Sequence, residues 1–134
     1  MDAFSFCSMY TVKYKYAIFC IYSLFWERIV MKLGIISNID KDHEYAFART
    51  AAGMIQARGA CAIVDQTYAD SVLGKDPNVS ISGYEACDLI FCIGGDGTFL
   101  SAVHDHYLKN VPIIGVNLGS IGFLTEISPD QFED

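Results

Sequence analysis

An uninterrupted apolar run, residues 89–93 (LIFCI), leads directly into the glycine-rich segment 94–98 (GGDGT). The run has no polar alternation, which is typical of a strand buried on both faces in a parallel sheet. Apolar residues then recur at helical spacing, at Phe99, Leu100, Val103 and Tyr107. Segment 94–98 therefore joins the carboxyl end of a strand to the amino end of a helix. α/β proteins bind phosphate at such a junction, because backbone N–H groups and the helix dipole both face the anion.

Each residue of segment 94–98 has a chemical reason to be there. Gly94, Gly95 and Gly97 allow positive φ angles and let a phosphate approach the backbone, since no Cβ intervenes. Thr98 can cap the helix or offer its hydroxyl to a ligand. Asp96 is unexpected, because a carboxylate repels phosphate; it suggests contact with a metal-bound phosphate or proton transfer from an attacking hydroxyl. The alternative is a solvent-exposed Asp-Gly turn, but the flanking strand and helix favour phosphate binding.

Two motifs carry a resemblance to known kinases. Segment 94–98 resembles the signature shared by NAD kinases, diacylglycerol and sphingosine kinases, and 6-phosphofructokinases. Segment 117–126 (NLGSIGFLTE) resembles the Asn-x-Gly-x-x-Gly-Phe-Leu stretch of NAD kinases, which the other kinases are not expected to carry. The resemblance covers about residues 31–134. It implies the N-terminal nucleotide-binding domain of an NAD kinase, without the mostly β C-terminal domain of that family.

The resemblance also implies an activity and site residues. NAD kinases transfer the γ-phosphoryl group of ATP to the 2′-hydroxyl of the adenosine ribose of NAD, which makes NADP, with a divalent metal such as Mg²⁺. Asp96 is then the catalytic residue, and it acts by orientation more than by basicity because aspartate is a weak base at pH 7. The residues implied for ATP phosphates are Gly94, Gly95, Gly97 and Thr98. The residues implied for NAD are Asp96, Gly97, Asn117, Gly119, Gly122, Phe123 and Leu124. No protein residue is assigned as a metal ligand.

Some roles stay open at this stage. Phe123 either plugs the core or forms a wall for the adenine ring. The donor can be ATP or polyphosphate, and the acceptor NAD or NADH. Lys41 can reach a phosphate, but a solvated loop lysine is the favoured interpretation. A metal site at His104 and His106 is disfavoured, because helical residues two apart point to different sides.

Sequence patterns along residues 31–134 predict an α/β, Rossmann-like parallel sheet of about four strands with flanking helices. The expected strands are 33–36, 60–64, 89–93 and 112–116. A helix is expected after the N-cap Asp42, with Phe47, Ala51, Met54 and Ile55 on one face, and it stops at Gly59. The helix after the motif is expected to end at Lys109-Asn110. Residues 65–87 are expected to form a variable connection with a short helix near 68–73, and Ser128-Pro129 to open a last helix.

Charge and cysteine content limit the partners and the compartment. The chain has a net charge of −7, and residues 31–134 alone carry −8. Nucleic acid and anionic membranes are therefore not expected partners of residues 31–134. Positive potential for a polyphosphate must come from backbone amides, a cation or residues outside the chain. The 5 cysteines match no zinc or disulfide framework, which suits a cytoplasmic location.

The two ends of the chain raise separate expectations. Residues 1–30 contain an uncharged aromatic run, 16–26, that is short for a membrane span. We expect Met31 to be the natural start and 1–30 to be an upstream extension; a membrane-associating anchor is the alternative. Because the family's second half is absent, we expect the chain to be an incomplete fragment, inactive by itself. The complete protein is expected to be a homo-oligomer that binds small nucleotides.

Two rival functions differ from this interpretation. One is a lipid kinase of the diacylglycerol or sphingosine type, which shares segment 94–98 but leaves segment 117–126 unexplained. The other is a non-catalytic nucleotide-binding module, which the missing half favours. Lipid acceptors would identify the first, and a gene that stops after Asp134 would favour the second.

Overall fold

A computed structural model describes residues 21, 30–105, 110–119, 125 and 127–134. The chain divides into two compact units, residues 1–30 and 31–134, and Ile21 and Val30 are the described residues of the first unit. Both expectations for residues 1–30 therefore fall almost entirely outside the described residues. Within the described part of the chain, no helix is long and apolar enough to cross a membrane.

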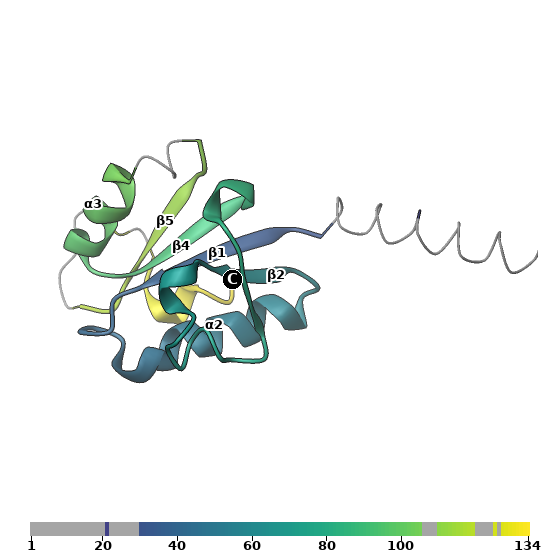
Figure 1. Ribbon diagram of the computed structural model, residues 1–134. Helices are drawn as coiled ribbons and strands as arrows, with labels where there is room; N and C mark the ends of the chain where they lie inside the picture. Colours follow the sequence, from purple (N-terminus) through teal and green to yellow (C-terminus); the bar gives the residue numbers. More distant parts are fainter. Residues whose placement is uncertain (1–20, 22–29, 106–109, 120–124, 126) are drawn as a thin grey trace, which may run out of the picture. The chain divides into compact units, whose positions relative to one another are not determined.

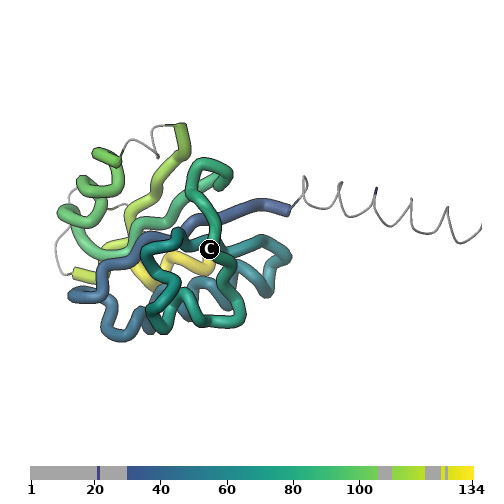
Figure 2. The backbone as a smooth tube through the Cα atoms, viewed as in Figure 1, coloured from purple at the N-terminus to yellow at the C-terminus, as the bar shows by residue number. Residues whose placement is uncertain are grey.

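The second unit is built on a five-stranded parallel sheet with the strand order β3-β2-β1-β4-β5 (Figures 1 and 2). The strands are β1 Lys32–Ser37, β2 Cys61–Val64, β3 Val79–Ile81, β4 Leu89–Gly94 and β5 Ile113–Asn117. The α/β parallel sheet is confirmed, with one strand more than expected. The additional strand, β3, lies in the predicted connection 65–87. It has only 3 residues, 2 of them exposed, so it leaves almost no hydrophobic pattern.

The strand order indicates where on the sheet a ligand would bind. From β1 the chain moves outward through β2 to β3, then returns to β4 on the other side of β1 and continues to β5. The order therefore reverses between β1 and β4. In an open parallel sheet, ligands bind at the carboxyl ends of the strands beside such a reversal.

Two helices cover opposite faces of the sheet (Figure 1). Helix α2, Ala46–Ala57, packs Ala48, Ala52 and Ile55 into a core cluster with β1, β2, β4 and β5. Helix α3, Asp96–His104, packs Ala102 into a second cluster, which contains Ile90 and Cys92 of β4. Four short 3₁₀ segments complete the described elements: η1 His43–Tyr45, η2 Gln66–Tyr68, η3 Tyr84–Ala86 and η5 Pro129–Gln131.

The helix predictions need correction in detail. The buried face of α2 consists mainly of alanines. Ala48, Ala51, Ala52 and Ile55 are buried, whereas Phe47 and Met54 are only partly buried. Helix α3 ends at His104, and residues 106–109 are outside the described part. The expected apolar face of α3 is wrong at Leu100 and Val103, which are 46% and 47% exposed. The Ser128-Pro129 start is right, but it opens a 3₁₀ segment.

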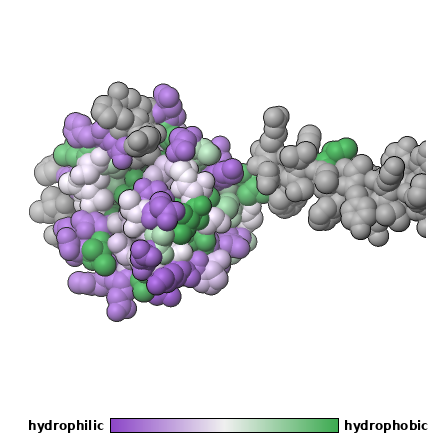
Figure 3. Space-filling view, in the orientation of Figure 1, coloured by the Kyte–Doolittle hydropathy of each residue, from purple (hydrophilic) through white to green (hydrophobic). Residues whose placement is uncertain are grey.

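The surface shows no single large apolar area on the face drawn in Figure 3, where hydrophilic residues separate small hydrophobic areas. The exposed large apolar side chains of the second unit come from separate elements. They are Met31, Ile39, Val72, Ile81, Leu100 and Val103. Of these, Ile39 lies two residues after the end of β1, in the loop at the carboxyl ends of the strands.

Candidate functional site

The two glycine-rich turns start from paired residues. In the β4–β5 ladder, Gly94 is the partner of Asn117, and both are the last residues of their strands. The N–H of Leu118 also donates a hydrogen bond to the carbonyl of Gly94 at 2.8 Å. Because both strands end here, the turn after β4 and the turn after β5 leave the sheet side by side. The expectation that both turns open onto one crevice is therefore confirmed for their described residues.

A cavity of about 240 Å³ lies between these turns, and we call it the central cavity. It receives residues from three segments: the loop after β1, the turn before α3 and the turn after β5. Its lining residues are Asn38, Lys41, Gly95, Asp96, Gly97, Thr98, Asn117 and Gly119. Six of the predicted site residues thus line one space, and Gly94 sits directly behind it. Gly122, Phe123 and Leu124 lie outside the described residues, so their roles stay predictions.

The first turn of α3 faces the central cavity with its backbone. The N-cap is Gly95, and the N–H of Phe99 donates to the Gly95 carbonyl at 3.1 Å, the first bond of the helix. The amides of Gly97 and Thr98 precede that bond and have no acceptor within the helix. They and the helix dipole produce positive potential here. The capping role considered for Thr98 is wrong, because Gly95 holds that position.

The glycines of this turn are required for two different reasons. A Cβ on Gly94 would lie 2.7 Å from Thr98 Oγ1, and the φ angle there is +157°, so the fold itself requires glycine. A Cβ on Gly97 would meet no described atom within 4 Å. Packing therefore does not explain Gly97, although glycine costs about 1 kcal/mol relative to alanine inside a helix. Close approach of a ligand to the backbone would explain it.

Asn38 connects the loop after β1 to this turn. Its side-chain amide donates to Thr98 Oγ1 at 3.2 Å, and its Oδ1 accepts from the N–H of Asp40 at 3.0 Å. The side chain thus fixes the Thr98 hydroxyl and folds its own loop at the same time. Sequence reasoning missed Asn38, because an asparagine in a polar loop usually serves only the loop itself.

Lys41 brings a positive charge to this site of an acidic chain. Its Nζ lies 4.0 Å from the position a Cβ would take on Gly95 and 3.7 Å from that position on Gly119. The residue is exposed, as expected of a loop lysine, but it lines the central cavity and reaches both turns. A phosphate contact by Lys41 stays a prediction; the sequence did not indicate that the loop folds back over the sheet edge and brings Lys41 to this cavity.

A buried carboxylate holds the loop that carries Asn38 and Lys41. Asp42 is 4% exposed; its carboxylate accepts from Ser37 Oγ at 2.9 Å and from the N–H groups of Phe47 and Ala48 at 2.8 and 2.9 Å. The predicted capping by Asp42 is confirmed, because its carboxylate accepts hydrogen bonds from N–H groups in the first turn of α2. The 3₁₀ segment η1 nevertheless lies between Asp42 and that helix. Glu44 and Tyr45 have φ angles of 53° and 54°, so the loop includes a left-handed turn.

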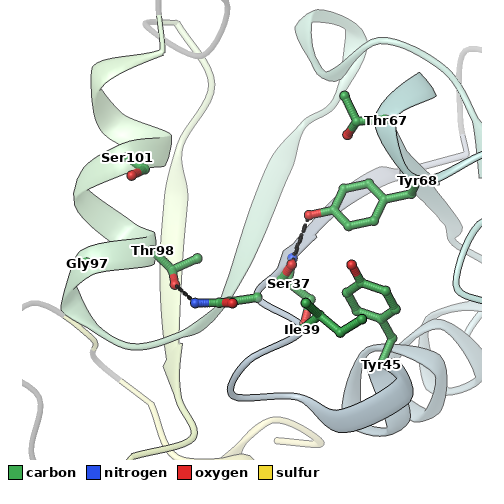
Figure 4. A pocket seen from close by; sticks show the side chains of 9 residues that line it. Ser37, Ile39, Tyr45, Thr67, Tyr68, Gly97, Thr98 and Ser101 are labelled. Carbon is green, nitrogen blue, oxygen red and sulfur yellow. Dashed lines mark hydrogen bonds between the residues drawn. The ribbon is translucent and has the colours of Figure 1, made fainter. Parts of the chain in front are cut away.

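A second cavity, of about 480 Å³, adjoins the central one, and we call it the tyrosine cavity (Figure 4). Thr98 and Ser101 of α3 lie on one side, and Tyr45, Thr67 and Tyr68 lie opposite. The Tyr68 hydroxyl donates to the Ser37 carbonyl and accepts from the Ser37 N–H, both at 3.0 Å. Burial raises the pKa of Tyr68 to about 12. The phenol therefore stays neutral well into the alkaline range.

A third cavity, of about 460 Å³, lies on the other side of the central one. It shares Asn117 and Gly119 with the central cavity. The side chain of Asn117 accepts from the N–H of Gly119 at 2.8 Å and so braces the turn. Among the described residues, no group of three His, Cys, Asp or Glu side chains could hold a metal ion.

Comparison with known proteins adds independent information. Residues 33–134 match the family model described as the ATP-NAD kinase N-terminal domain. The NAD kinase of Acetivibrio thermocellus is 37% identical over 106 residues, which cover 78% of this chain and 37% of that protein. The NAD kinase of Haloarcula marismortui is 35% identical over 108 residues, 75% of this chain and 38% of that protein.

The fold also matches a solved structure. Yeast NADH kinase, crystallised with NADH, superposes with a TM-score of 0.59 at 18% identity, over 76% of this chain and 33% of that one. At this identity the match shows the fold alone. The present chain thus spans a little over one third of the length of the curated relatives it matches.

Proposed function

This chain belongs to the ATP-NAD kinase family, and we propose on that basis that it forms the phosphate-binding part of an enzyme that makes NADP. The reaction transfers the γ-phosphoryl group of ATP to the 2′-hydroxyl of the adenosine ribose of NAD. The observation that carries the proposal is the central cavity, where the turns after β4 and β5 meet beside Lys41. We also propose a cytoplasmic location, where both nucleotides are available.

In phosphoryl transfer the protein mainly aligns the reactants and neutralises charge. The geometry supports a separate role for each group that lines the central cavity. Amides of the first α3 turn bind phosphate oxygens, and Gly95 and Gly97 let them approach. Lys41 neutralises charge from across the cavity. Asp96 faces the same space and orients the 2′-hydroxyl for attack, with Asn117 and Gly119 positioning the acceptor.

The donor set of the central cavity fits a magnesium ion carried by the nucleotide. Among the described residues that line it, Asp96 is the one carboxylate, and Mg²⁺ is usually held by one or two carboxylates together with substrate phosphates. When bound, the ion would neutralise phosphate charge. Asp96 would then both hold the ion and orient the 2′-hydroxyl.

The expected activity belongs to the complete enzyme. Relatives are almost three times as long as the matched region, and we propose that residues beyond it complete the acceptor site and support a homo-oligomer. A lipid kinase remains the alternative enzyme, and a non-catalytic nucleotide-binding module the alternative without chemistry. Segment 117–126 favours NAD as the acceptor over a lipid.

The test uses the longest polypeptide that the gene encodes. We expect ³²P from γ-labelled ATP to appear in NADP when NAD is supplied and not in lipid when diacylglycerol or sphingosine is supplied. Asp96→Asn should lower kcat by about 10² to 10⁴-fold with little change in ATP affinity. Unchanged turnover in Asp96→Asn would remove its catalytic role, and labelled lipid would replace the proposal with the lipid-kinase alternative.

A further inference from the structure

We propose that the tyrosine cavity binds the nucleoside of the phosphoryl donor, with its phosphate chain passing Thr98 into the central cavity. This inference rests on the proposed function and adds to it the place of the donor's base and ribose. It also places the donor nucleotide and the acceptor nucleotide on opposite sides of the central cavity.

The sizes of the two cavities suit this division. At about 480 Å³ the tyrosine cavity falls within the usual range for small-molecule sites, roughly 300–1,000 Å³, whereas the central cavity, at about 240 Å³, falls below it. A phosphate chain fits the smaller space, and a base with its ribose needs the larger one.

The chemistry of the walls also differs between the cavities. Among the described residues, all nine that line the tyrosine cavity are uncharged: Ser37, Asn38, Ile39, Tyr45, Thr67, Tyr68, Gly97, Thr98 and Ser101. The central cavity, by contrast, is lined by Lys41 and Asp96. Neutral walls favour a neutral group over further phosphates.

Aromatic and hydroxyl groups in the tyrosine cavity match a nucleoside. Tyr45 and Tyr68 meet edge to face, with ring centroids 5.6 Å apart, so their packing gives the wall a fixed shape. Ile39 is 53% exposed beside them and offers apolar surface that a planar base would cover. Thr67 and Ser101 lie on opposite sides of the space, and each has a hydroxyl group that can bind ribose or base edges (Figure 4).

The two cavities adjoin each other. Both are lined by Asn38, Gly97 and Thr98, so a ligand can extend from one to the other past the first turn of α3. On the opposite side, Asn117 and Gly119 connect the central cavity to the third cavity, beside the turn assigned to NAD. The donor's nucleoside therefore has the tyrosine cavity to itself.

The test compares ATP with inorganic tripolyphosphate by titration calorimetry on the 134-residue chain. Tripolyphosphate carries the phosphates without the nucleoside. The key variant is Ser101→Phe, which fills the tyrosine cavity from an exposed position. Its matched control is Val103→Phe on the same helix, which is 47% exposed and does not line this cavity. Circular dichroism checks that both variants fold.

We expect the unsubstituted chain to bind ATP about tenfold tighter than tripolyphosphate, as a base–aromatic contact predicts. Ser101→Phe should remove that advantage and leave tripolyphosphate affinity within about twofold, whereas Val103→Phe should change neither affinity. Equal affinities for the two ligands in the unsubstituted chain, or an ATP advantage that survives Ser101→Phe, would overturn the inference and leave the phosphate site intact. Failure of both ligands to bind would overturn the phosphate site and the inference together.

Photolabelling with 8-azido-ATP gives a second measurement that needs no substitution. Trypsin places the lining residues of the tyrosine cavity in peptides 33–41, 42–49, 59–75 and 76–109, and the turn after β5 in peptide 110–134. We expect the label in one or more of the first four peptides, with competition by ATP. Label confined to 110–134 would place the base on the acceptor side and overturn the inference.

Discussion

The side-chain amide of Asn38 donates a hydrogen bond to Thr98 Oγ1 at 3.2 Å, across a sequence separation of 60 residues. It joins the carboxyl end of β1 to the first turn of α3 at the place where the strand order reverses. Both residues line the central cavity and the tyrosine cavity. The bond thus lies at the boundary between the two spaces.

Breaking this bond should affect stability and binding together. In a double-mutant cycle with Asn38→Ala and Thr98→Val, we expect a coupling of about 0.5–1.5 kcal/mol in the free energy of unfolding, measured with urea. Affinity for ATP should fall about tenfold in Asn38→Ala, because the turn loses its brace. Asp40→Ala, an exposed neighbour, is the control and should change neither quantity. Additive effects of the two substitutions would show that the bond stabilises nothing.

Lys41 should account for much of the phosphate affinity of this acidic chain. At low ionic strength, we expect Lys41→Ala to weaken tripolyphosphate binding about tenfold, because it removes a positive charge close to both turns. Lys41→Arg should retain most of the affinity, and Lys75→Ala, an exposed lysine outside the cavities, should behave like the unsubstituted chain. Added salt should shrink the difference, since it screens exposed charges. Equal losses for Lys41→Ala and Lys75→Ala would show a general charge effect.

Gly97→Ala should change the free energy of unfolding and the phosphate affinity in opposite directions. A Cβ at this position meets no described atom, so we expect the free energy of unfolding to rise by about 0.5–1 kcal/mol from helix propensity. Phosphate affinity should nevertheless fall, because the methyl group occupies space beside the α3 amides. Gly94→Ala is the contrasting variant and should destabilise the fold, since its Cβ would clash with Thr98. Unchanged tripolyphosphate affinity in Gly97→Ala would place the anion elsewhere.

Much of this fold could be predicted because the strongest patterns are local. The β4 run and the glycine-rich turn after it indicate a strand followed by a helix, and both are present; phosphate binding by the turn stays a prediction. Strand β3 could not be found, because 3 residues at a sheet edge show no periodicity. The burial of α3 was misjudged for a different reason: helical spacing gives a face, but it does not say that Leu100 and Val103 point away from the sheet.

The site was predictable where function lies in consecutive residues and hidden where it depends on tertiary contacts. Glycines and Asp96 form a motif that can be recognised in the sequence alone. Asn38 and Lys41 reach the same cavity only because Asp42 folds the loop after β1 back toward the sheet edge. That fold depends on a buried carboxylate, and sequence patterns do not report burial of a charged residue.

Stability should fall steeply at alkaline pH. Burial raises the pKa of Tyr68 from 10.0 to about 12, of Cys92 from 9.0 to about 12 and of Cys87 from 9.0 to about 11, and it also raises the pKa of Tyr84. Between about pH 9 and pH 12 the unfolded chain therefore loses protons that the folded chain keeps. With fewer protons bound to the unfolded state, the free energy of unfolding decreases as pH rises.

Urea unfolding at pH 8.0, 9.5 and 10.5 in the presence of reductant measures this effect. Each group that is fully ionised in the unfolded state alone contributes a slope of about 1.4 kcal/mol per pH unit. Tyr68→Phe provides the matched comparison: it should lower stability at pH 8.0, because the two hydrogen bonds to Ser37 are lost, and it should also flatten the decline above pH 10. A free energy of unfolding that stays constant from pH 8.0 to 10.5 would mean that these side chains reach solvent in the native state.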